Sequence, residues 1–374
     1  MTITMFSSMI ILVEDFIHHY SCKQGTYGMA ELTWKGKCFP LDNSQDIASS
    51  TTSSILTQEH YTAAYNTESD GLSNTVHLSP ANWHNRLILG DKGVILPALL
   101  DDFSSKVDLI YIDPPFMTGR IFMNGTQRAY KDTWGNDIDI YLQWLYETLT
   151  FLYRLLSERG SLYVHLDWRT IHYAKLVLDE VFHHSQAGGG GFRNEIIWHY
   201  QSGGRSHKGY ARKHDTILLY TKSANACFHG ERIGERRGTQ KRNNMRKEVA
   251  ADGHIFWTIR SAGRLYSYDE DSYITPSDVW SDIPHLHQRD PERTGYATQK
   301  PETLLERIIA ASSDEHDLVL DCFCGSGVTP IVAEKLKRRW IVCDESPLSI
   351  TTTRTRLLAN ERHLPFVIQH VVKK

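Results

Sequence analysis

Short apolar runs that alternate with helical patterns constrain the fold of this chain more than any other feature. Strands are expected at residues 86–90, 107–112, 161–166, 195–199, 216–221, 318–321 and 340–343. Helices are expected at residues 140–158 (ended by Gly160), 169–182, 301–312, 328–336 and 347–360. The run 107–112 has the apolar character of a strand buried on both faces of a parallel sheet. The alternation therefore predicts an α/β protein with a doubly wound, mostly parallel sheet.

Two regions depart from this alternation. Residues 1–80 form an N-terminal extension, predicted to be partly disordered, with a Ser/Thr-rich stretch at 44–57 that is typical of a loop or linker. Residues 223–296 are basic, Gly-rich and aromatic with weak periodicity, which predicts an inserted module of loops and short elements. The chain is thus expected to divide at about residues 80, 222 and 296.

The apolar runs of the chain predict a protein that does not enter a membrane. None reaches the roughly 18 residues that a membrane span needs. The run 9–13 has no basic residue before it and is followed by Glu14 and Asp15, so it makes a poor signal peptide. We expect a cytoplasmic protein with reduced cysteines, and neither the cysteines nor the nineteen histidines show metal-ligand spacing.

Positive charge is concentrated in one part of the chain, although the net charge is −3. Residues 203–247 contain twelve lysines and arginines and three acidic residues. Such a cluster is the footprint of a nucleic-acid-binding face, and the alternative is a solvated surface.

The first chemical motif, Asp113-Pro114-Pro115-Phe116, directly follows the strand at 107–112. Two prolines fix φ and remove backbone donors, which would leave the Pro114 carbonyl as an acceptor beside the Asp113 carboxylate. These two acceptors suit the two N–H groups of an amine on a base, and Phe116 offers a flat face. Without such a ligand the motif would be a proline-stiffened turn.

The second motif, Asp321-Cys-Phe-Cys-Gly-Ser-Gly327, lies between a strand and a helix. Its glycines allow a ligand to approach the backbone N–H groups of the helix start. Asp344 ends the next strand about twenty residues later, the spacing at which an acidic residue reaches a ribose in nucleotide-type folds. The alternative is an ordinary tight turn.

Together these motifs resemble those of the amino-group DNA methyltransferases of the permuted beta class, which include the modification enzymes of restriction systems. In that family Asp-Pro-Pro-Phe is the catalytic motif and Phe-x-Gly-x-Gly binds S-adenosylmethionine, in the order found here. The stretches 160–167, 213–222 and 298–301 also match, and 89–91 matches more weakly. The resemblance covers residues 83–358 and implies a Rossmann-like, circularly permuted fold with an inserted target-recognition region.

The resemblance also implies roles for individual residues. The catalytic group is Asp113, Pro114, Pro115 and Phe116. The residues that bind S-adenosylmethionine are Asp91, Thr298, Lys300, Asp321, Phe323, Gly325, Ser326, Gly327 and Asp344. Arg205, Arg212, Arg236, Arg237 and Arg242 are expected to contact DNA, and no metal is expected.

Three positions depart from the family pattern. The family commonly has Pro and Thr where Cys322 and Val328 stand, which bears on cofactor affinity. The family commonly has Asn at the position of Met117, directly after the catalytic motif, and this difference bears on how the target base is held.

The expected activity is methyl transfer from S-adenosylmethionine to adenine N6 in duplex DNA, with the base rotated out of the helix. Asp at the head of the catalytic motif favours adenine over cytosine N4. The absence of a Pro-Cys pair argues against cytosine C5 chemistry. An RNA or protein-amide methyltransferase, a non-catalytic DNA-binding protein and a dinucleotide-dependent oxidoreductase are the weaker alternatives. A cognate restriction endonuclease and a homodimer stay open as partners.

Overall fold

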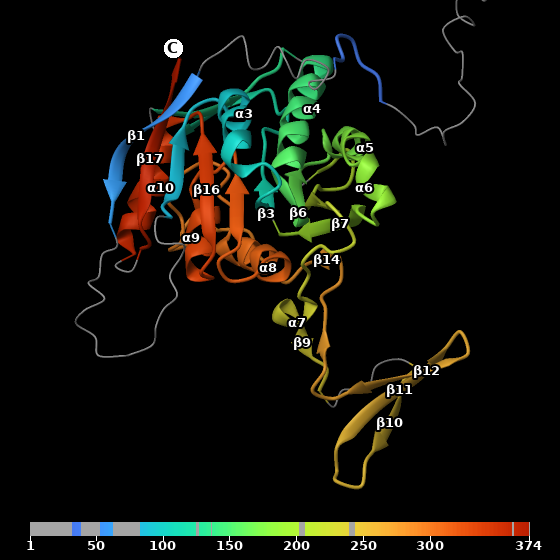
Figure 1. Ribbon diagram of the computed structural model, residues 1–374. Helices are drawn as coiled ribbons and strands as arrows, with labels where there is room; N and C mark the ends of the chain where they lie inside the picture. Colours follow the sequence, from blue (N-terminus) through green and yellow to red (C-terminus); the bar gives the residue numbers. More distant parts are fainter. Residues whose placement is uncertain are drawn as a thin grey trace, which may run out of the picture. The chain divides into compact units, whose positions relative to one another are not determined.

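In the computed structural model the described residues are 32–38, 53–62, 83–124, 127–135, 137–201, 206–238, 244–360 and 363–373. Its main feature is a sheet of ten strands (Figure 1). In spatial order the strands are β1 (Ser53–Tyr61), β17 (Phe366–Lys373), β2 (Asn85–Leu89), β16 (Arg339–Asp344), β15 (Leu318–Asp321), β3 (Val107–Ile112), β6 (Leu156–Leu166), β8 (His214–Thr221), β7 (Gly191–His199) and β14 (Val279–Trp280).

The strands from β17 to β6 are all parallel to one another. Strand β8 runs antiparallel to both of its neighbours, β6 and β7, and β1 pairs antiparallel with β17. The mostly parallel sheet predicted from the sequence is therefore confirmed, with an antiparallel strand near one edge.

Helices cover both faces of this sheet, as a doubly wound fold requires. Leu109 and Tyr111 of β3 belong to the same core cluster as residues of α8 (Glu302–Ser312), α9 (Val328–Lys335) and α10 (Pro347–Ala359). Ile110 and Ile112 point to the other face because side chains alternate along a strand, and they too are fully buried. Helices α3 (Lys92–Phe103), α4 (Ile138–Leu155) and α5 (Ile171–Val181) pack against one another in sequence order.

The boundary between α4 and β6 differs from the prediction. Asp137 caps α4 by accepting hydrogen bonds from the backbone N–H groups of Asp139 and Ile140. The helix ends at Leu155, not at Glu158, and Gly160 lies inside β6. A Cβ at Gly160 would lie 2.9 Å from the backbone carbonyl oxygen of Ser157 and 2.7 Å from Leu156 Cδ1, so glycine is required by close packing within the strand, not by a helix end.

Among the elements with no counterpart in the predicted pattern are β1, β17, α3 and the hairpin of β4 (Arg120–Asn124) and β5 (Gln127–Asp132). Strand β1 overlaps the Ser/Thr-rich stretch, so the loop interpretation is wrong for residues 53–57, while 44–52 lie outside the described residues. Pairing with β17, about 310 residues away, stabilises this strand, and no local pattern can indicate such a partner.

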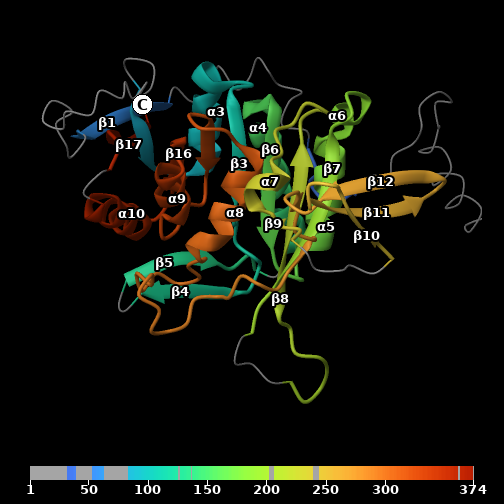
Figure 2. The same cartoon turned by 90° about the horizontal axis from the view of Figure 1, so that it is seen from below.

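The region between β8 and α8 contains short strands of its own. Helix α7 (Gly230–Ile233) precedes β9 (Glu235–Arg236), which pairs with β13 (Tyr273–Ile274). Between these two strands lies a three-stranded antiparallel sheet of β10 (Arg246–Val249), β11 (Ile255–Ser261) and β12 (Arg264–Asp269), labelled in Figures 1 and 2. Helix α6 (His183–Ala187) completes the elements. Among the described residues, no helix combines the length and apolar character needed to cross a membrane.

Candidate active site

Acidic residues stand at or just after the carboxyl ends of five neighbouring parallel strands. Along the sheet they are Asp91, Asp344, Asp321, Asp113 and Asp167, from β2, β16, β15, β3 and β6. Because parallel strands end at the same edge, the two motifs identified in the sequence meet there. Ligands of such folds bind at this edge.

A cavity of about 230 Å³ opens at this edge of the sheet. The predicted site residues that line it are Asp91, Asp113, Pro114, Pro115, Phe116, Thr298, Lys300, Asp321, Phe323, Gly325, Ser326 and Asp344. Gly327 is absent from the lining and lies directly behind it as the N-cap of α9. All four residues of the catalytic motif and eight of the nine predicted cofactor residues therefore surround one space.

Asp113 is held at one carboxylate oxygen only. Its Oδ2 forms an ion pair with Lys300 Nζ, and both side chains are largely buried. Its Oδ1 is buried and has no hydrogen-bond partner among the described residues. A buried carboxylate oxygen without a donor is costly, and a ligand N–H group would satisfy it.

The other residues of the catalytic motif are also fixed in place. Tyr141 of α4 donates a hydrogen bond of 3.0 Å to the Pro115 carbonyl oxygen. No donor in the described part of the chain contacts the Pro114 carbonyl oxygen. The Phe116 ring lies 6.1 Å from the His165 ring and 5.4 Å from Lys300 Nζ. The motif thus keeps two acceptors unpaired next to an aromatic ring.

Behind Phe116 lies a buried polar network that the sequence did not reveal. His165 is fully buried, and its Nδ1 lies 2.9 Å from the Tyr111 hydroxyl. Its Nε2 lies 3.3 Å from Asp215 Oδ2, and Tyr200 donates to Asp215 Oδ1 at 3.0 Å. Burial raises the pKa of Asp215, but the interactions with His165, the charge of Lys300 and the Tyr200 hydrogen bond together leave that pKa lowered.

The glycine turn is organised by the two acidic residues that flank it in the sheet. Asp344 accepts hydrogen bonds of 2.9 Å from the N–H groups of Gly325 and Ser346. Asp321 accepts from the Phe323 N–H at 2.9 Å and from Thr329 Oγ1 at 2.5 Å. Burial raises the pKa of Asp321 to about 7 and that of Asp344 to about 6.

Several cavity residues were not predicted from the sequence. Trp144 of α4 contacts the Phe323 ring at 5.6 Å, and Lys92 Nζ lies 4.4 Å above the Trp144 ring. Burial lowers the pKa of Lys92. Tyr130 and Asp132 of β5 and Tyr296 are further examples. Trp144 is one of many apolar residues in the helical pattern of α4, so the sequence offers no signal that separates it from a core residue.

These walls suit a nucleoside-like ligand with a charged tail. Aromatic rings at Phe323 and Trp144 suit a flat purine, and backbone N–H groups and carboxylates suit hydroxyl and amino groups. The departures Cys322 and Val328 are buried and line the cavity. Met117 does not line it, and its backbone has a left-handed φ of 61°.

Three of the predicted DNA-contacting arginines are described, and none lines the cavity. The exposed Arg212 lies 3.7 Å from the centre of the exposed Trp168 ring. Arg236 pairs with Asp271, and Arg237 lies over the Tyr268 ring. Arg205 and Arg242 lie outside the described residues. The role of all five in DNA binding stays a prediction.

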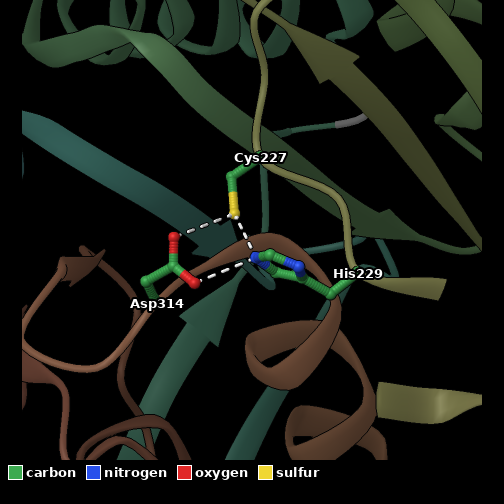
Figure 3. Close-up of side chains that lie close together, drawn as sticks. All are labelled: Cys227, His229 and Asp314. Carbon is green, nitrogen blue, oxygen red and sulfur yellow. Dashed lines mark hydrogen bonds and ion pairs between the residues drawn. The ribbon is translucent and has the colours of Figure 1, made fainter. Parts of the chain in front are cut away.

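Cys227, His229 and Asp314 form a cluster away from this cavity (Figure 3). His229 Nε2 lies 3.1 Å from Cys227 Sγ and 2.9 Å from Asp314 Oδ1. Arg232 and Arg159 also contact the Asp314 carboxylate, at 2.8 and 2.6 Å, and lower its pKa. A metal ion would compete with two guanidinium groups, so we interpret the cluster as ion pairing between the segment after β8 and the end of α8. The expectation of no metal site stays a prediction.

Comparison with known proteins extends these observations. The family model for N6/N4 DNA methylases matches residues 107–353. The type II methyltransferase M.HpaI of Haemophilus parainfluenzae is 31% identical over 268 residues, 70% of this chain and 71% of that protein. The DNA adenine methyltransferase YhdJ of Escherichia coli strain K12 is 30% identical over 240 residues, 64% and 71% of the two chains. The crystal structure of the M1.HpyAVI complex with S-adenosylmethionine aligns at 21% identity with a TM-score of 0.45, over 73% of this chain and 100% of that one.

The fold, the strand-edge cavity and the family match together define a Rossmann-like, class I methyltransferase that uses S-adenosylmethionine. The match over residues 107–353 places it more narrowly: the chain belongs to the N6/N4 DNA methylase family. It is an amino-group DNA methyltransferase of the restriction–modification type. The resemblance stated from the sequence is thereby confirmed.

Proposed function

We propose that this protein methylates adenine N6 in duplex DNA at a specific sequence, after the base rotates out of the helix. The observation that carries the proposal is the pair of unpaired acceptors at Asp113 Oδ1 and the Pro114 carbonyl, next to the glycine turn. An exocyclic amine has two N–H groups, one for each acceptor. Its nitrogen is a weak nucleophile because its lone pair is delocalised into the ring, so orienting these N–H groups is the main task of the site.

The residues of this chain would act as follows. Asp113 Oδ1 and the Pro114 carbonyl accept the two amine protons, and Phe116 stacks on the base. Lys300 fixes Asp113 by occupying Oδ2. As the nitrogen becomes positively charged, the Asp113 carboxylate stabilises it and is placed to take the proton that the nitrogen loses. Much of the acceleration then comes from holding the reacting atoms in line.

S-Adenosylmethionine supplies the methyl group on a positively charged sulfur. We assign its binding to the nine residues named from the sequence, with Asp344 at the ribose, Asp91 towards the adenine, and Thr298 and Lys300 towards the methionine end. Asp344 already accepts two backbone hydrogen bonds. Each carboxylate oxygen can accept a second bond, so a ribose hydroxyl still fits.

The choice of adenine is supported by Asp at the head of the catalytic motif and by the likeness to the DNA adenine methyltransferase YhdJ. Cytosine N4 is the alternative, because both amines present the same two protons. Incubation with radiolabelled S-adenosylmethionine and mixed-sequence duplex DNA, followed by nucleoside analysis, separates the two. Label in N4-methylcytosine alone would contradict the choice of adenine.

The catalytic assignment has its own test. We expect Asp113→Ala to lower the rate of methyl transfer about 100-fold or more, because the amine loses its charged acceptor. Calorimetric affinity for S-adenosylmethionine should stay close to that of wild type. Asp101→Ala, on the exposed face of α3, is the matched control and should retain full activity. Unchanged transfer in Asp113→Ala would refute the assignment.

Partners and location also belong to this proposal. A relative named as the Mod subunit of a type III restriction–modification enzyme supports a cognate endonuclease with the same target sequence. A homodimer and a cytoplasmic location stay predictions. Residues 223–296 are proposed as the target-recognition region and residues 81–222 and 297–374 as the two halves of the methyltransferase domain.

A further inference from the structure

A single buried carboxylate holds the chain segment that follows the catalytic motif. Asp132, the last residue of β5, is 1% exposed. Its Oδ1 accepts hydrogen bonds from the Met117 N–H at 2.9 Å and from Trp134 Nε1 at 3.1 Å. Its Oδ2 accepts from the Thr118 N–H at 2.8 Å and from Thr118 Oγ1 at 2.6 Å. Both oxygens are therefore fully used, and all four donors are uncharged groups that bond more strongly to an ionised acceptor.

The segment held by Asp132 has an unfavourable backbone. Met117 has a φ of 61°, in the left-handed region that side chains with a Cβ avoid. Gly119 follows with a φ of 71°, and its N–H donates to the Asp132 carbonyl oxygen at 3.0 Å. Surrounding contacts must maintain such a conformation, and the Asp132 hydrogen bonds to residues 117–119 are the contacts that do so.

This conformation sets the direction in which the chain leaves the catalytic motif. Met117 is joined directly to Phe116, so a change at its φ angle redirects residues 118 onward and pulls on the motif from its C-terminal side. Tyr141 donates to the carbonyl of Pro115, which precedes Phe116 in the chain, whereas Asp132 holds the residues that follow Phe116. In the described part of the chain, Asp132 is the side chain that hydrogen-bonds to Met117 and Thr118.

We propose that Asp132 is a positioning residue for methyl transfer, which fixes the Asp113–Phe116 motif by holding Met117 in the left-handed conformation. The proposal rests on the proposed function, because it assigns Asp132 to the geometry of that reaction. Asp132 contacts neither the amine nor the methyl donor in this scheme. It acts through the backbone that carries Asp113 and Pro114.

The test is Asp132→Asn. One oxygen then becomes an NH₂ group, which cannot accept the backbone N–H of Met117 or Thr118 that faces it, so at least one of these backbone hydrogen bonds is lost. We expect kcat to fall about 100-fold, as for a small misplacement of reacting groups. KM for DNA and calorimetric affinity for S-adenosylmethionine should change less than about threefold, on the same argument. Asp137→Asn is the matched control, because Asp137 also accepts two backbone N–H groups but at the exposed start of α4, where Asn caps equally well.

A second substitution distinguishes positioning from a general effect on folding. Asn adopts the left-handed region more readily than Met, so Met117→Asn in the Asp132→Asn background should recover roughly tenfold in kcat. Thr118→Val, which removes only one of the four hydrogen bonds, should lower kcat severalfold and serves if Asp132→Asn does not fold.

The outcomes separate this proposal from the proposed function. Wild-type transfer together with an Asp132→Asn kcat within about twofold of wild type would overturn the role of Asp132 alone. Loss of kcat that Met117→Asn does not restore would overturn it as well. If Asp132→Asn does not fold, an unchanged kcat in Thr118→Val would overturn the positioning role of Asp132. Failure of the wild-type protein to methylate any DNA would overturn both.

Discussion

At the scale of single residues, the glycine turn depends on space that only glycine leaves. Gly327 has a φ of 76°, and a Cβ there would lie 2.5 Å from Thr353 Oγ1 of α10. Gly263, in the turn between β11 and β12, has a nearly identical φ of 77° but no atom within 4 Å of its ideal Cβ. The two positions thus share backbone strain and differ in crowding.

This pair makes a prediction that separates the two effects. Gly263→Ala should lower the free energy of unfolding by about 1 kcal/mol, from the left-handed backbone alone. Gly327→Ala should lower it by about 3 kcal/mol, because α10 must also shift. It should also weaken binding of S-adenosylmethionine, since the turn lines its proposed site. Urea unfolding and calorimetry measure both, and equal losses of stability would show that the contact with Thr353 is unimportant.

At the scale of secondary-structure elements, helix α9 buries a carboxyl group against β16. Glu334 is 9% exposed, and its Oε1 accepts from Trp340 Nε1 at 3.2 Å. Its Oε2 is buried without a hydrogen-bond partner in the described residues. Burial raises the pKa of Glu334 to about 7. The folded protein therefore holds a proton that the unfolded chain releases at lower pH.

The pH dependence of stability follows from this shift. Between the ordinary pKa of 4.5 and about 7, the folded state binds more protons than the unfolded state, so stability falls as pH rises. We expect Glu334→Gln to match wild type at pH 4 and to be more stable by up to about 3 kcal/mol at pH 8.5. Thermal unfolding at both pH values is the measurement. A gain that is the same at both would contradict a charged origin.

At the scale of the whole molecule, the sheet of β10 to β12 lies in the sequence between two short strands that pair with each other, β9 and β13. Arg236 of β9 is opposite Tyr273 of β13. Next to this pair, the Gly238 N–H donates to the Glu270 carbonyl oxygen at 2.8 Å. The two residues that flank 239–269, Gly238 and Glu270, are therefore hydrogen-bonded neighbours. A two-residue Asn-Gly turn is the right length to join them and close the antiparallel pair.

This geometry permits a clean excision. Replacing residues 239–269 by Asn-Gly should leave affinity for S-adenosylmethionine unchanged, because none of residues 244–269, the described part of this segment, lines the cavity. Sequence-specific DNA methylation should be lost if these residues belong to the target-recognition region. Calorimetry tests the expected affinity for S-adenosylmethionine, and methylation of mixed-sequence duplexes tests the expected loss of sequence-specific methylation. Retained specificity would remove this segment from the recognition region.

The sequence by itself determined the class of the fold and the two motifs of the site. Strands such as 107–112 are predictable because their side chains are buried on both faces, which leaves an apolar run in the sequence. Asp113 and Asp321 are predictable as neighbours because parallel strands end at one edge. Both inferences need only local patterns and the rule that relates strand direction to chain order.

Only the tertiary structure decided which side chains restrain these motifs. Lys300 pairs with Asp113 across 187 residues, and β1 pairs with β17 across most of the chain. Asp132 reads in the sequence as an ordinary polar residue, since no strand was predicted at residues 127–132. Hydrogen bonds and strand pairings between distant segments depend on side-chain direction and register after folding, and neither leaves a periodic trace in the sequence.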